Sequence, residues 1–251
     1  MLRALRHLAQ RVGRHLPLAD SRCCACGKVH PLPGPASAST LCLPCRAALA
    51  GQESTPCPGC GQYPPVPQLL PTLCGECRRT TRPWGTVLVF GPYTGSLRDL
   101  ILAYKFNERL DLGRQLQECA LAAYEEGLRQ HPDLPKPDAI VPVPLHSRRL
   151  LRRGFNQSRE IARLLAQRTG VPIVQEALVR VRRTVPQMEL DRSERSTNML
   201  GAFAANRELV QGRSLLLVDD IMTTGSTLEE CAKVLLVYGA ARVDVLILAR
   251  A

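Results

Sequence analysis

Two adjacent acids, Asp219 and Asp220, follow an uninterrupted apolar run at 215–218 and precede a stretch of small hydroxyl residues at 223–227. An apolar run without alternation is typical of a strand buried on both faces, and open α/β sheets bind ligands at the carboxyl ends of such strands. Two carboxylates are costly in a core but suit sugar hydroxyls or a hydrated magnesium ion. Backbone N–H groups and hydroxyls at the start of a helix suit a phosphate. The pattern therefore predicts a sugar and phosphate site at the end of a central strand.

The hydroxyl stretch has a simpler interpretation as a helix cap. Ser226 with Glu229, and Thr227 with Glu230, both have the spacing of a capping box. A cap accounts for one hydroxyl and leaves two acids and the other hydroxyls unexplained, which favours the ligand site. The stretch is not a Walker loop, because it contains no lysine. Since neighbours on a strand point to opposite faces, we expect one acid to face the ligand and the other to support the loop.

Metal chemistry is concentrated in the first third of the chain, where eight cysteines form four C-x-x-C pairs. The pairs are Cys23/Cys26, Cys42/Cys45, Cys57/Cys60 and Cys74/Cys77. Fifteen residues separate the first two pairs and thirteen separate the last two. Two residues between thiols place both sulfurs on one metal ion, and a second pair completes a tetrahedron. The spacing predicts structural zinc, because four thiolates leave no coordination position for water.

The number and pairing of the zinc sites stay open in the sequence. Sequential pairing, first with second and third with fourth, is our expectation, and an interleaved pairing fits the same residues. The shorter second spacer also allows a single zinc ion beside one decayed site. Disulfides are disfavoured because no secretion signal is present and such turns would strain them, and four copies in a Pro/Gly-rich segment do not resemble a redox motif. A segment this small lacks an adequate core, so metal binding would supply its folding energy.

Composition sets the broad class of protein. The chain has 251 residues, 45% apolar and only 4% aromatic, which allows one α/β domain with an aliphatic core and a small accessory module. A net charge of +11 favours phosphate esters, nucleic acid or an anionic membrane face as partners, although a genome rich in arginine codons gives the same excess. No run of about 20 apolar residues predicts a membrane span. The basic segment 1–16 lacks the apolar stretch of a secretory signal, and we expect a docked helix there and a cytoplasmic protein.

Strand and helix patterns alternate after a change of composition at 78–86. Strands are predicted at 87–91, 138–144, 171–174, 214–220 and 242–249, and helices at 96–106, 110–128, 158–169 and 227–240. This alternation predicts an α/β fold with a mostly parallel sheet and helices on both faces. The polar stretch 180–200 is typical of a mobile lid over a reactive site.

Residues 215–227 resemble the phosphoribosyl-diphosphate (PRPP) motif of type I phosphoribosyltransferases. The resemblance implies that Asp219 and Asp220 hold the ribose hydroxyls and that magnesium bridges ribose and pyrophosphate. It also implies a cradle for the 5-phosphate. The residues of this cradle are Thr223, Thr224, Gly225, Ser226 and Thr227.

Segments 140–158, 182–187 and 195–203, behind the cysteine pairs, extend the resemblance to the ComF family. It covers nearly everything from Cys23 to Arg250. The family implies a small double zinc ribbon followed by a type I phosphoribosyltransferase-like domain. We therefore predict a basic arm at 1–20, the double ribbon at 21–82 and the transferase-like domain at 83–251.

The same resemblance adds cationic residues to the predicted site. The loop 145–157 is similar to a pyrophosphate loop, with a solvated basic loop as the alternative, and 180–198 resembles the flexible loop of type I enzymes. The candidates are Arg148 and Arg153 for pyrophosphate, and Arg182 and Arg183 beside Asp219 and Asp220 for catalysis. Lys105 matches a lysine of similar family members and is a candidate phosphate ligand, with a helix-surface lysine as the alternative.

The resemblance implies a role in competence and DNA uptake and leaves the activity open between three classes. The first is a PRPP-dependent transferase acting on a nitrogen acceptor. The acceptor is unknown because the sequence has no base-recognition signature, and it also shows no catalytic triad and no glutaminase segment. The second is a non-catalytic adaptor for single-stranded DNA and competence proteins, and the few aromatic residues predict salt-sensitive contacts to DNA phosphates. The third is a sensor that binds PRPP or a nucleotide without turnover.

Overall fold

The computed structural model describes residues 20–23, 25–31, 41–50, 54–106, 109–145, 150–151, 154–182 and 200–251. Contacts between residues divide the chain into two units, Met1–Ala50 and Gly51–Ala251. The helix predicted within 1–16 lies outside the described residues.

In the first unit an antiparallel hairpin precedes a short helix. Strands β1 (Asp20–Arg22) and β2 (Val29–Pro31) pair, and helix α2 (Leu43–Ala50) follows. The N–H of Gly27 donates to the carbonyl of Cys23, and Gly27 has a φ of 73°, so a glycine permits the turn between the strands. The sequence patterns predicted neither element, because each is too short to show a period.

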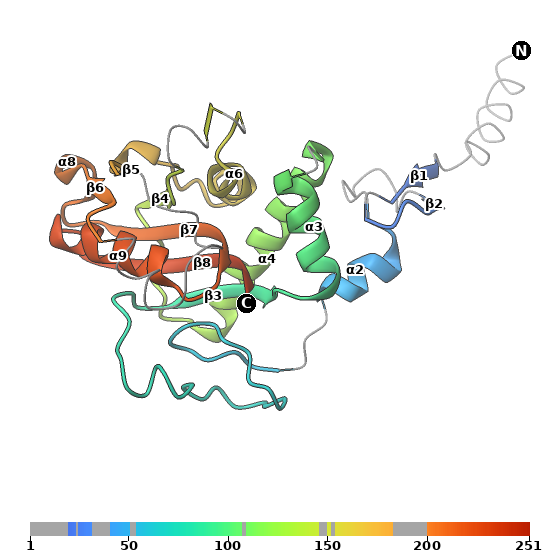
Figure 1. The fold of residues 1–251 in the computed structure, drawn as a ribbon, viewed down its shortest axis with the longest axis horizontal. Coiled ribbons are helices and arrows are strands. Elements are labelled where there is room, and N and C mark those ends of the chain that lie inside the picture. Colours follow the sequence, from blue (N-terminus) through green and yellow to red (C-terminus); the bar gives the residue numbers. More distant parts are fainter. Residues whose placement is uncertain are drawn as a thin grey trace, which may run out of the picture. The chain divides into compact units, whose positions relative to one another are not determined.

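The second unit is built on a four-stranded sheet in which every pair of neighbours is parallel. The strand order is β3 (Val87–Pro92), β8 (Arg242–Arg250), β7 (Ser214–Met222) and β4 (Ala139–Pro142). The central strands β7 and β8 are buried along most of their length, as expected of strands covered on both faces. The strand predicted at 171–174 contributes only one bridge, between Ile173 and Ile140. Because the strands are parallel, their carboxyl ends lie at one edge of the sheet (Figure 1).

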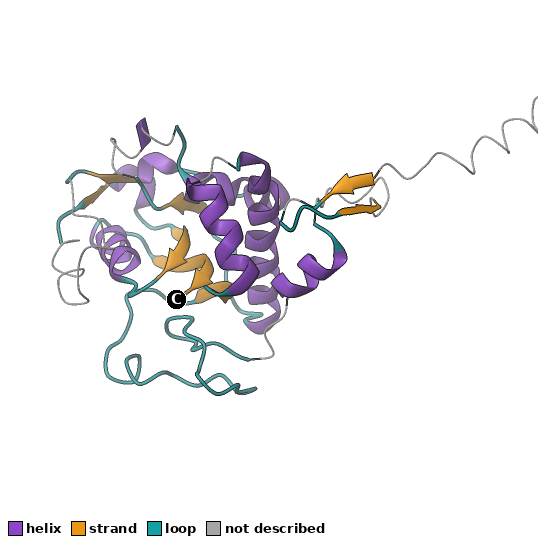
Figure 2. Cartoon of the chain, turned by 45° about the vertical axis from the view of Figure 1, so that its right-hand side comes forward, coloured by secondary structure: helices purple, strands orange, loops and turns teal. Residues whose placement is uncertain are grey.

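Helices cover both faces of this sheet (Figures 1 and 2). The main helices are α3 (Gly95–Phe106), α4 (Gly113–Gln130), α6 (Gln157–Thr169) and α9 (Ser226–Val237). The shorter elements are η1 (Leu110–Leu112), η2 (Gln175–Ala177), β5 (Leu178–Arg180), β6 (Phe203–Ala205) and α8 (Arg207–Val210). Helices α4 and α6 pack together and on the strands, whereas Leu215 and Leu217 of β7 share a core cluster with Leu228 and Leu235 of α9. The predicted fold class is therefore confirmed.

Local signals fix both ends of α6. The side-chain oxygen of Asn156 accepts the N–H of Ser158, and Gly170 ends the helix with a φ of 70°. Ser158 is thereby held in the first turn of the helix, at the edge of the sheet where the strands end.

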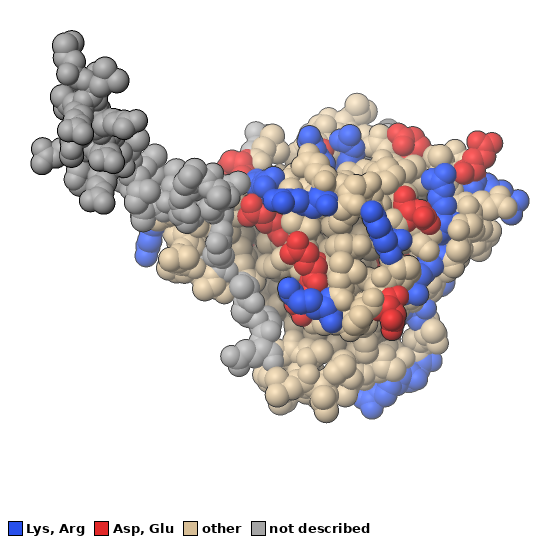
Figure 3. Space-filling model, turned by 180° about the vertical axis from the view of Figure 1, so that it is seen from behind, with Lys and Arg blue, Asp and Glu red and all other residues tan. Residues whose placement is uncertain are grey.

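The surface of the described residues carries both signs of charge. On the face shown in Figure 3, Lys and Arg side chains are interspersed with Asp and Glu side chains. Exposed ion pairs among the described residues include Arg109 with Asp111 and Arg129 with Glu126. Within the described part of the chain, no helix combines the length and apolar character that crossing a membrane requires.

A close approach between α4 and β3 makes this packing testable. A Cβ added to Gly127 would lie 2.4 Å from Cδ2 of the buried Leu88. We expect Gly127→Ala to lower the free energy of unfolding by about 1–3 kcal/mol, because overpacking outweighs the gain of about 1 kcal/mol that alanine gives inside a helix. Denaturant unfolding measures the change. Combined with Leu88→Ala, the substitution should cost less than the sum of the two single changes, and strictly additive costs would contradict the contact.

Candidate functional site

Asp219 and Asp220 lie at the end of the central strand β7, as the sequence predicts. The hydroxyl of Ser158 donates to Oδ1 of Asp219 at 2.9 Å, and the same oxygen accepts the N–H of Asp220 at 2.9 Å. The Nδ2 group of Asn156 donates to the carbonyl of Val143, just beyond β4, at 3.1 Å. The start of α6 is therefore hydrogen-bonded to the ends of two neighbouring strands, β4 and β7. The bond from Ser158 fixes the position of the Asp219 side chain.

The second acid forms an ion pair with Lys105, in the last turn of α3. The Nζ atom lies 2.8 Å from Oδ1 of Asp220, and the two side chains are only 15% and 12% exposed. Lys105 is therefore not the solvated helix-surface lysine of the alternative interpretation, and its contact with a phosphate stays a prediction. The two acids thus take their partners from different helices, which agrees with the alternation of side chains along a strand.

The electrostatics of the pair favour an additional positive partner. Burial and the neighbouring Asp220 carboxylate raise the pKa of Asp219 to about 7, while Lys105, the hydroxyl of Ser158 and the N–H of Asp220 act in the opposite direction. Two carboxylates beside one lysine leave a negative charge that a proton, a metal ion or hydroxyl donors would offset.

The loop 223–227 does not use its hydroxyls as the predicted cap. The N-cap of α9 is Gly225, which has a φ of 87° and makes no side-chain capping bond. The capping-box interpretation through Ser226 or Thr227 is therefore wrong. The Oγ1 atom of Thr224 and the Oγ atom of Ser226 lie 2.7 Å apart. The first N–H groups of a helix have no acceptor within the helix, so this loop combines amide donors with adjacent hydroxyls.

A cavity of about 910 Å³ adjoins Lys105. It is lined by Tyr104, Lys105, Phe106, Leu110, Gly113, Arg114, Gln117, Gly154, Phe155 and Glu160. The rings of Tyr104 and Phe155 pack with their centroids 5.3 Å apart, which joins α3 to the residues preceding α6. The volume suits a small-molecule ligand, and the wall combines aromatic rings with the cations Lys105 and Arg114.

Three of the predicted cationic residues lie outside the described residues. These are Arg148, Arg153 and Arg183. Arg182 is described, and its Nη2 group donates to the carbonyl of Leu200 at 2.7 Å. This bond joins the two ends of the segment predicted to be a lid. The roles of all four arginines in binding or catalysis stay predictions.

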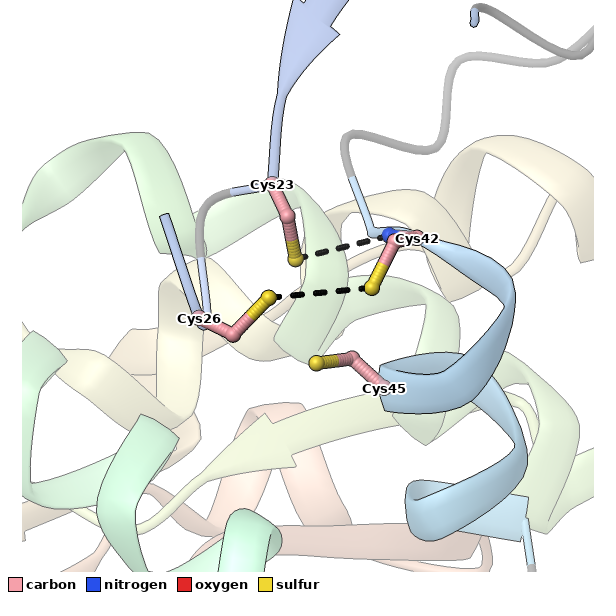
Figure 4. Close-up of side chains that lie close together, drawn as sticks. All are labelled: Cys23, Cys26, Cys42 and Cys45. Carbon is pink, nitrogen blue, oxygen red and sulfur yellow. Dashed lines mark hydrogen bonds between the residues drawn. The ribbon is translucent and has the colours of Figure 1, made fainter. Parts of the chain in front are cut away.

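The eight paired cysteines form two groups of four, joined in sequential order. The groups are Cys23, Cys26, Cys42 and Cys45, and Cys57, Cys60, Cys74 and Cys77. Within each group the sulfur atoms all lie within 4.8 Å of one another, and Figure 4 shows the first group. The interleaved pairing is therefore wrong, and each group offers a complete set of four donors.

The spacing of the sulfur atoms fits zinc. The Sγ atoms of Cys26 and Cys42 lie 3.7 Å apart, as do those of Cys60 and Cys74. A tetrahedron with Zn–S bonds of about 2.3 Å has edges of about 3.8 Å. In each group the N–H of the third cysteine also donates to the sulfur of the first, at 3.4 Å and 3.3 Å. Both donor sets therefore fit a structural zinc ion.

Hydrogen bonds lower the pKa of one thiol in each group, whereas burial raises the pKa of Cys45, Cys60 and Cys77. At Cys23 burial acts to raise the pKa, but the backbone N–H groups of Cys26 and Cys42 outweigh it and lower the pKa to about 6. At Cys74 burial is likewise outweighed by hydrogen bonds with the backbone N–H of Cys77 and with the side chains of Cys60 and Cys77, and the pKa falls to about 7. A lowered pKa favours the thiolate, which is the form that binds zinc.

Side chains that the sequence analysis did not single out join the second group to the sheet. The indole N–H of Trp84 donates to the carbonyl of Gly59 at 2.9 Å, and Nε of Arg250 donates to the carbonyl of Cys60 at 3.0 Å. The one available signal was that Trp84, the chain's single tryptophan, lies at the change of composition. The contacts place this group within the unit Gly51–Ala251, and the boundary at 82/83 stays a prediction.

Comparisons with known proteins identify the family of this chain. Residues 117–251 match the family described as "Phosphoribosyl transferase domain". "DNA utilization protein YhgH" of Salmonella typhi is 38% identical over 213 residues, which cover 84% of this chain and 90% of that protein. "Competence protein F" of Haemophilus influenzae is 32% identical over 222 residues, covering 84% of this chain and 96% of that protein. The chain belongs to the ComF family.

These matches confirm the predicted resemblance to the ComF family, whereas binding of PRPP by residues 215–227 stays a prediction. Among solved structures, a glutamine PRPP amidotransferase from B. subtilis is 21% identical, with 58% of this chain and 30% of that chain covered. Its TM-score of 0.38 is too low to carry an argument.

Asp219→Asn tests the electrostatics of this ComF site. Burial raises the pKa of Asp219 in the folded protein to about 7, well above its pKa of about 4 in an unfolded chain. The contribution of Asp219 to the free energy of unfolding therefore falls as the pH rises from about 4 through 7. Asparagine keeps an oxygen that accepts from Ser158 and removes the charge. We expect the variant to have a higher Tm than wild type at pH 8 and to lose this advantage near pH 4. Thermal unfolding across that range measures the effect, and a difference independent of pH would contradict the raised pKa.

Proposed function

We propose that this ComF protein binds PRPP with magnesium at the carboxyl end of β7 and transfers its phosphoribosyl group to a nitrogen acceptor. The observation that carries the proposal is a pair of acids on β7, held by Lys105 and Ser158, that lies two residues before a loop of amides and hydroxyls at 223–227. A sugar phosphate carries ring hydroxyls, which suit the two acids, and a phosphate group, which suits the loop.

The acids would hold the ribose. Asp219 and Asp220 accept hydrogen bonds from the ribose hydroxyls, and Lys105 already offsets one of their two charges. The remaining charge suits a hydrated magnesium ion, which prefers oxygen ligands and keeps several waters. Magnesium, when bound with PRPP, would neutralise the pyrophosphate and favour its departure.

The loop 223–227 would hold the 5-phosphate. Amide N–H groups at the start of α9 and the hydroxyls of Thr223, Thr224, Ser226 and Thr227 are its donors, and the positive end of the helix dipole favours the anion. Gly225 matters because its φ of 87° would strain any other residue.

The cavity beside Lys105 would receive the pyrophosphate and the acceptor. Lys105 and Arg114 supply positive charge from its wall, and Arg148 and Arg153 are the predicted additions. The bond between the anomeric carbon and pyrophosphate oxygen breaks, the bond from nitrogen to that carbon forms, and the nitrogen loses its proton to solvent or pyrophosphate. The chain contributes positioning, charge stabilisation and exclusion of water, with Arg182 and Arg183 in the proposed lid.

We further propose that this activity serves DNA uptake or utilisation in the cytoplasm, with single-stranded DNA and competence proteins as partners. The names of the two relatives support the process, and a net charge of +11 supports an anionic partner. The interspersed charges in Figure 3 favour weak, salt-sensitive DNA contacts on that face.

The second candidate function is an adaptor or sensor without turnover, which the lack of a base-recognition signature favours.

Calorimetric titration of PRPP and magnesium into the zinc-loaded protein tests the ligand. We expect wild type to bind and the Asp219→Asn/Asp220→Asn double variant to bind at least about 100-fold more weakly, because several charge-assisted hydrogen bonds are lost. Glu126→Gln removes an exposed carboxylate of α4 and should bind as wild type does. A folded wild type that does not bind PRPP would contradict the proposal.

Pyrophosphate release separates the two candidate functions. Incubation of PRPP and magnesium with nucleobases and nucleic acid should release pyrophosphate in wild type and not in the double variant. Binding without release from any acceptor would favour the sensor. Affinity for single-stranded DNA should fall steeply between about 50 and 200 mM salt, and an unchanged affinity would oppose a phosphate-dominated contact.

A further inference from the structure

Three side chains, those of Arg250, Trp84 and Arg82, contact both the second cysteine group or its turns and the phosphate loop or its flanking residues. We propose that the group Cys57/Cys60/Cys74/Cys77 holds the loop 223–227 in its binding conformation, and that Arg250 and Trp84 are the positioning residues between them. The identity of the ligand rests on the proposed function, whereas the coupling rests on contacts within the unit Gly51–Ala251.

Arg250 forms the most direct connection. It is the last residue of β8 and is only 7% exposed. Its Nε group donates to the carbonyl of Cys60 at 3.0 Å, and its Nη1 group donates to the carbonyl of Met222 at 3.1 Å and to that of Thr223. A planar guanidinium fixes the angles between its donors. One buried guanidinium therefore fixes the position of Cys60, a zinc-ligand candidate, relative to Thr223, the first residue of the phosphate loop.

Trp84 forms a second connection on the same side of the loop. Its indole N–H donates to the carbonyl of Gly59 at 2.9 Å. A Cβ placed on Gly225 would lie 3.7 Å from Cη2 of Trp84, so the indole ring contacts the N-cap of α9. The ring is 6% exposed. It therefore supports the glycine at the centre of the phosphate loop from the turn that carries Cys57 and Cys60.

Arg82 joins the other half of the group to α9. Its guanidinium lies 2.7 Å from the carboxylate of Glu76, between Cys74 and Cys77, and 3.0 Å from that of Glu229 in the first turn of α9. Its side chain is 6% exposed. Both halves of the second group are thus bridged by side chains to the segment that begins at Met222 and ends in α9.

The metal would control these contacts through the backbone of the first turn. The N–H of Gly61 donates to the carbonyl of Cys57 at 2.8 Å, and a Cβ on Gly59 would lie 3.0 Å from Sγ of Cys77. The conformation of this turn sets the directions of the Gly59 and Cys60 carbonyls, which accept from Trp84 and Arg250. In our proposal, these directions are kept only while the four cysteines hold the metal. Zinc supplies folding energy to such turns, so its loss would release the loop and add an ordering cost to phosphate binding.

The experiment compares variants of the two groups, because the first group lies in the separate unit Met1–Ala50 and serves as a matched control. Zinc content, PRPP affinity by calorimetry and hydrogen exchange of the amides at 223–229 are measured for each protein. The variants are Cys60→Ser, Cys42→Ser, Trp84→Phe, Arg250→Lys and, as a control for general destabilisation, Gly127→Ala.

We expect two zinc ions in wild type and one in each cysteine variant. Cys60→Ser should bind PRPP about tenfold more weakly and lose amide protection at 223–229, whereas Cys42→Ser and Gly127→Ala should retain both properties. Trp84→Phe keeps an aromatic side chain and leaves all eight zinc ligands in place, but it lacks the N–H donor and the full width of the indole. Arg250→Lys keeps the positive charge but not the planar, multiple donors of the guanidinium. Both variants should bind two zinc ions and should show smaller losses of PRPP affinity and of amide protection at 223–229. If Cys60→Ser does not fold, these two variants test the coupling.

The inference and the proposed function fail in different ways. Unchanged affinity and protection in Trp84→Phe and Arg250→Lys, or equal losses in Cys42→Ser, would overturn the coupling and leave the PRPP site intact. Wild type that binds no PRPP would overturn the ligand, while hydrogen exchange at 223–229 would still report whether the second group orders the loop.

Discussion

The site depends on the placement of two negative charges at the end of a strand that is otherwise apolar. Burying carboxylates is costly unless they are paired and hydrogen-bonded, and two helices at this edge of the sheet each supply part of the compensation. Lys105 from α3 pairs with Asp220, and Ser158 from α6 binds Asp219. The compensation is incomplete, because burial still raises the pKa of Asp219 to about 7. A ligand that brings hydroxyls and a metal ion would complete it, and this is the physical basis for a sugar phosphate at this position.

The central strand and the cysteine groups could be predicted because their signals are local. The run 215–218 lacks alternation, and β7 is indeed a central parallel strand. The spacing of the cysteines predicted zinc but left the pairing open, and the distances between the sulfur atoms confirm the sequential order that we expected. The site's partners carry no such signal, since the partner of Asp220 is a lysine at the end of a helix whose sequence is equally compatible with a solvated position. The capping-box pattern at Ser226 and Thr227 was misleading, because a glycine with positive φ can begin a helix without a side-chain cap.

The two cysteine groups have the same ligand chemistry but different surroundings. The first lies between a hairpin and α2 in the unit Met1–Ala50, and the second lies in the unit that contains the sheet. The contact between Arg250 and Cys60 spans 190 residues, so no periodicity or motif could have revealed it. We infer that the second group combines the role of a structural metal site with support for the phosphate loop. A ribbon expected to be a separate module would then be part of the framework of the ligand site.

A crystal structure of the zinc-loaded protein with PRPP and magnesium tests the central claim most directly. The predicted result is density for the 5-phosphate against the amides of 223–227, with the ribose hydroxyls on Asp219 and Asp220 and the pyrophosphate toward Lys105. Phosphate density at another part of the surface, with the two acids contacting no ligand atom, would contradict a phosphoribosyl site at the end of β7.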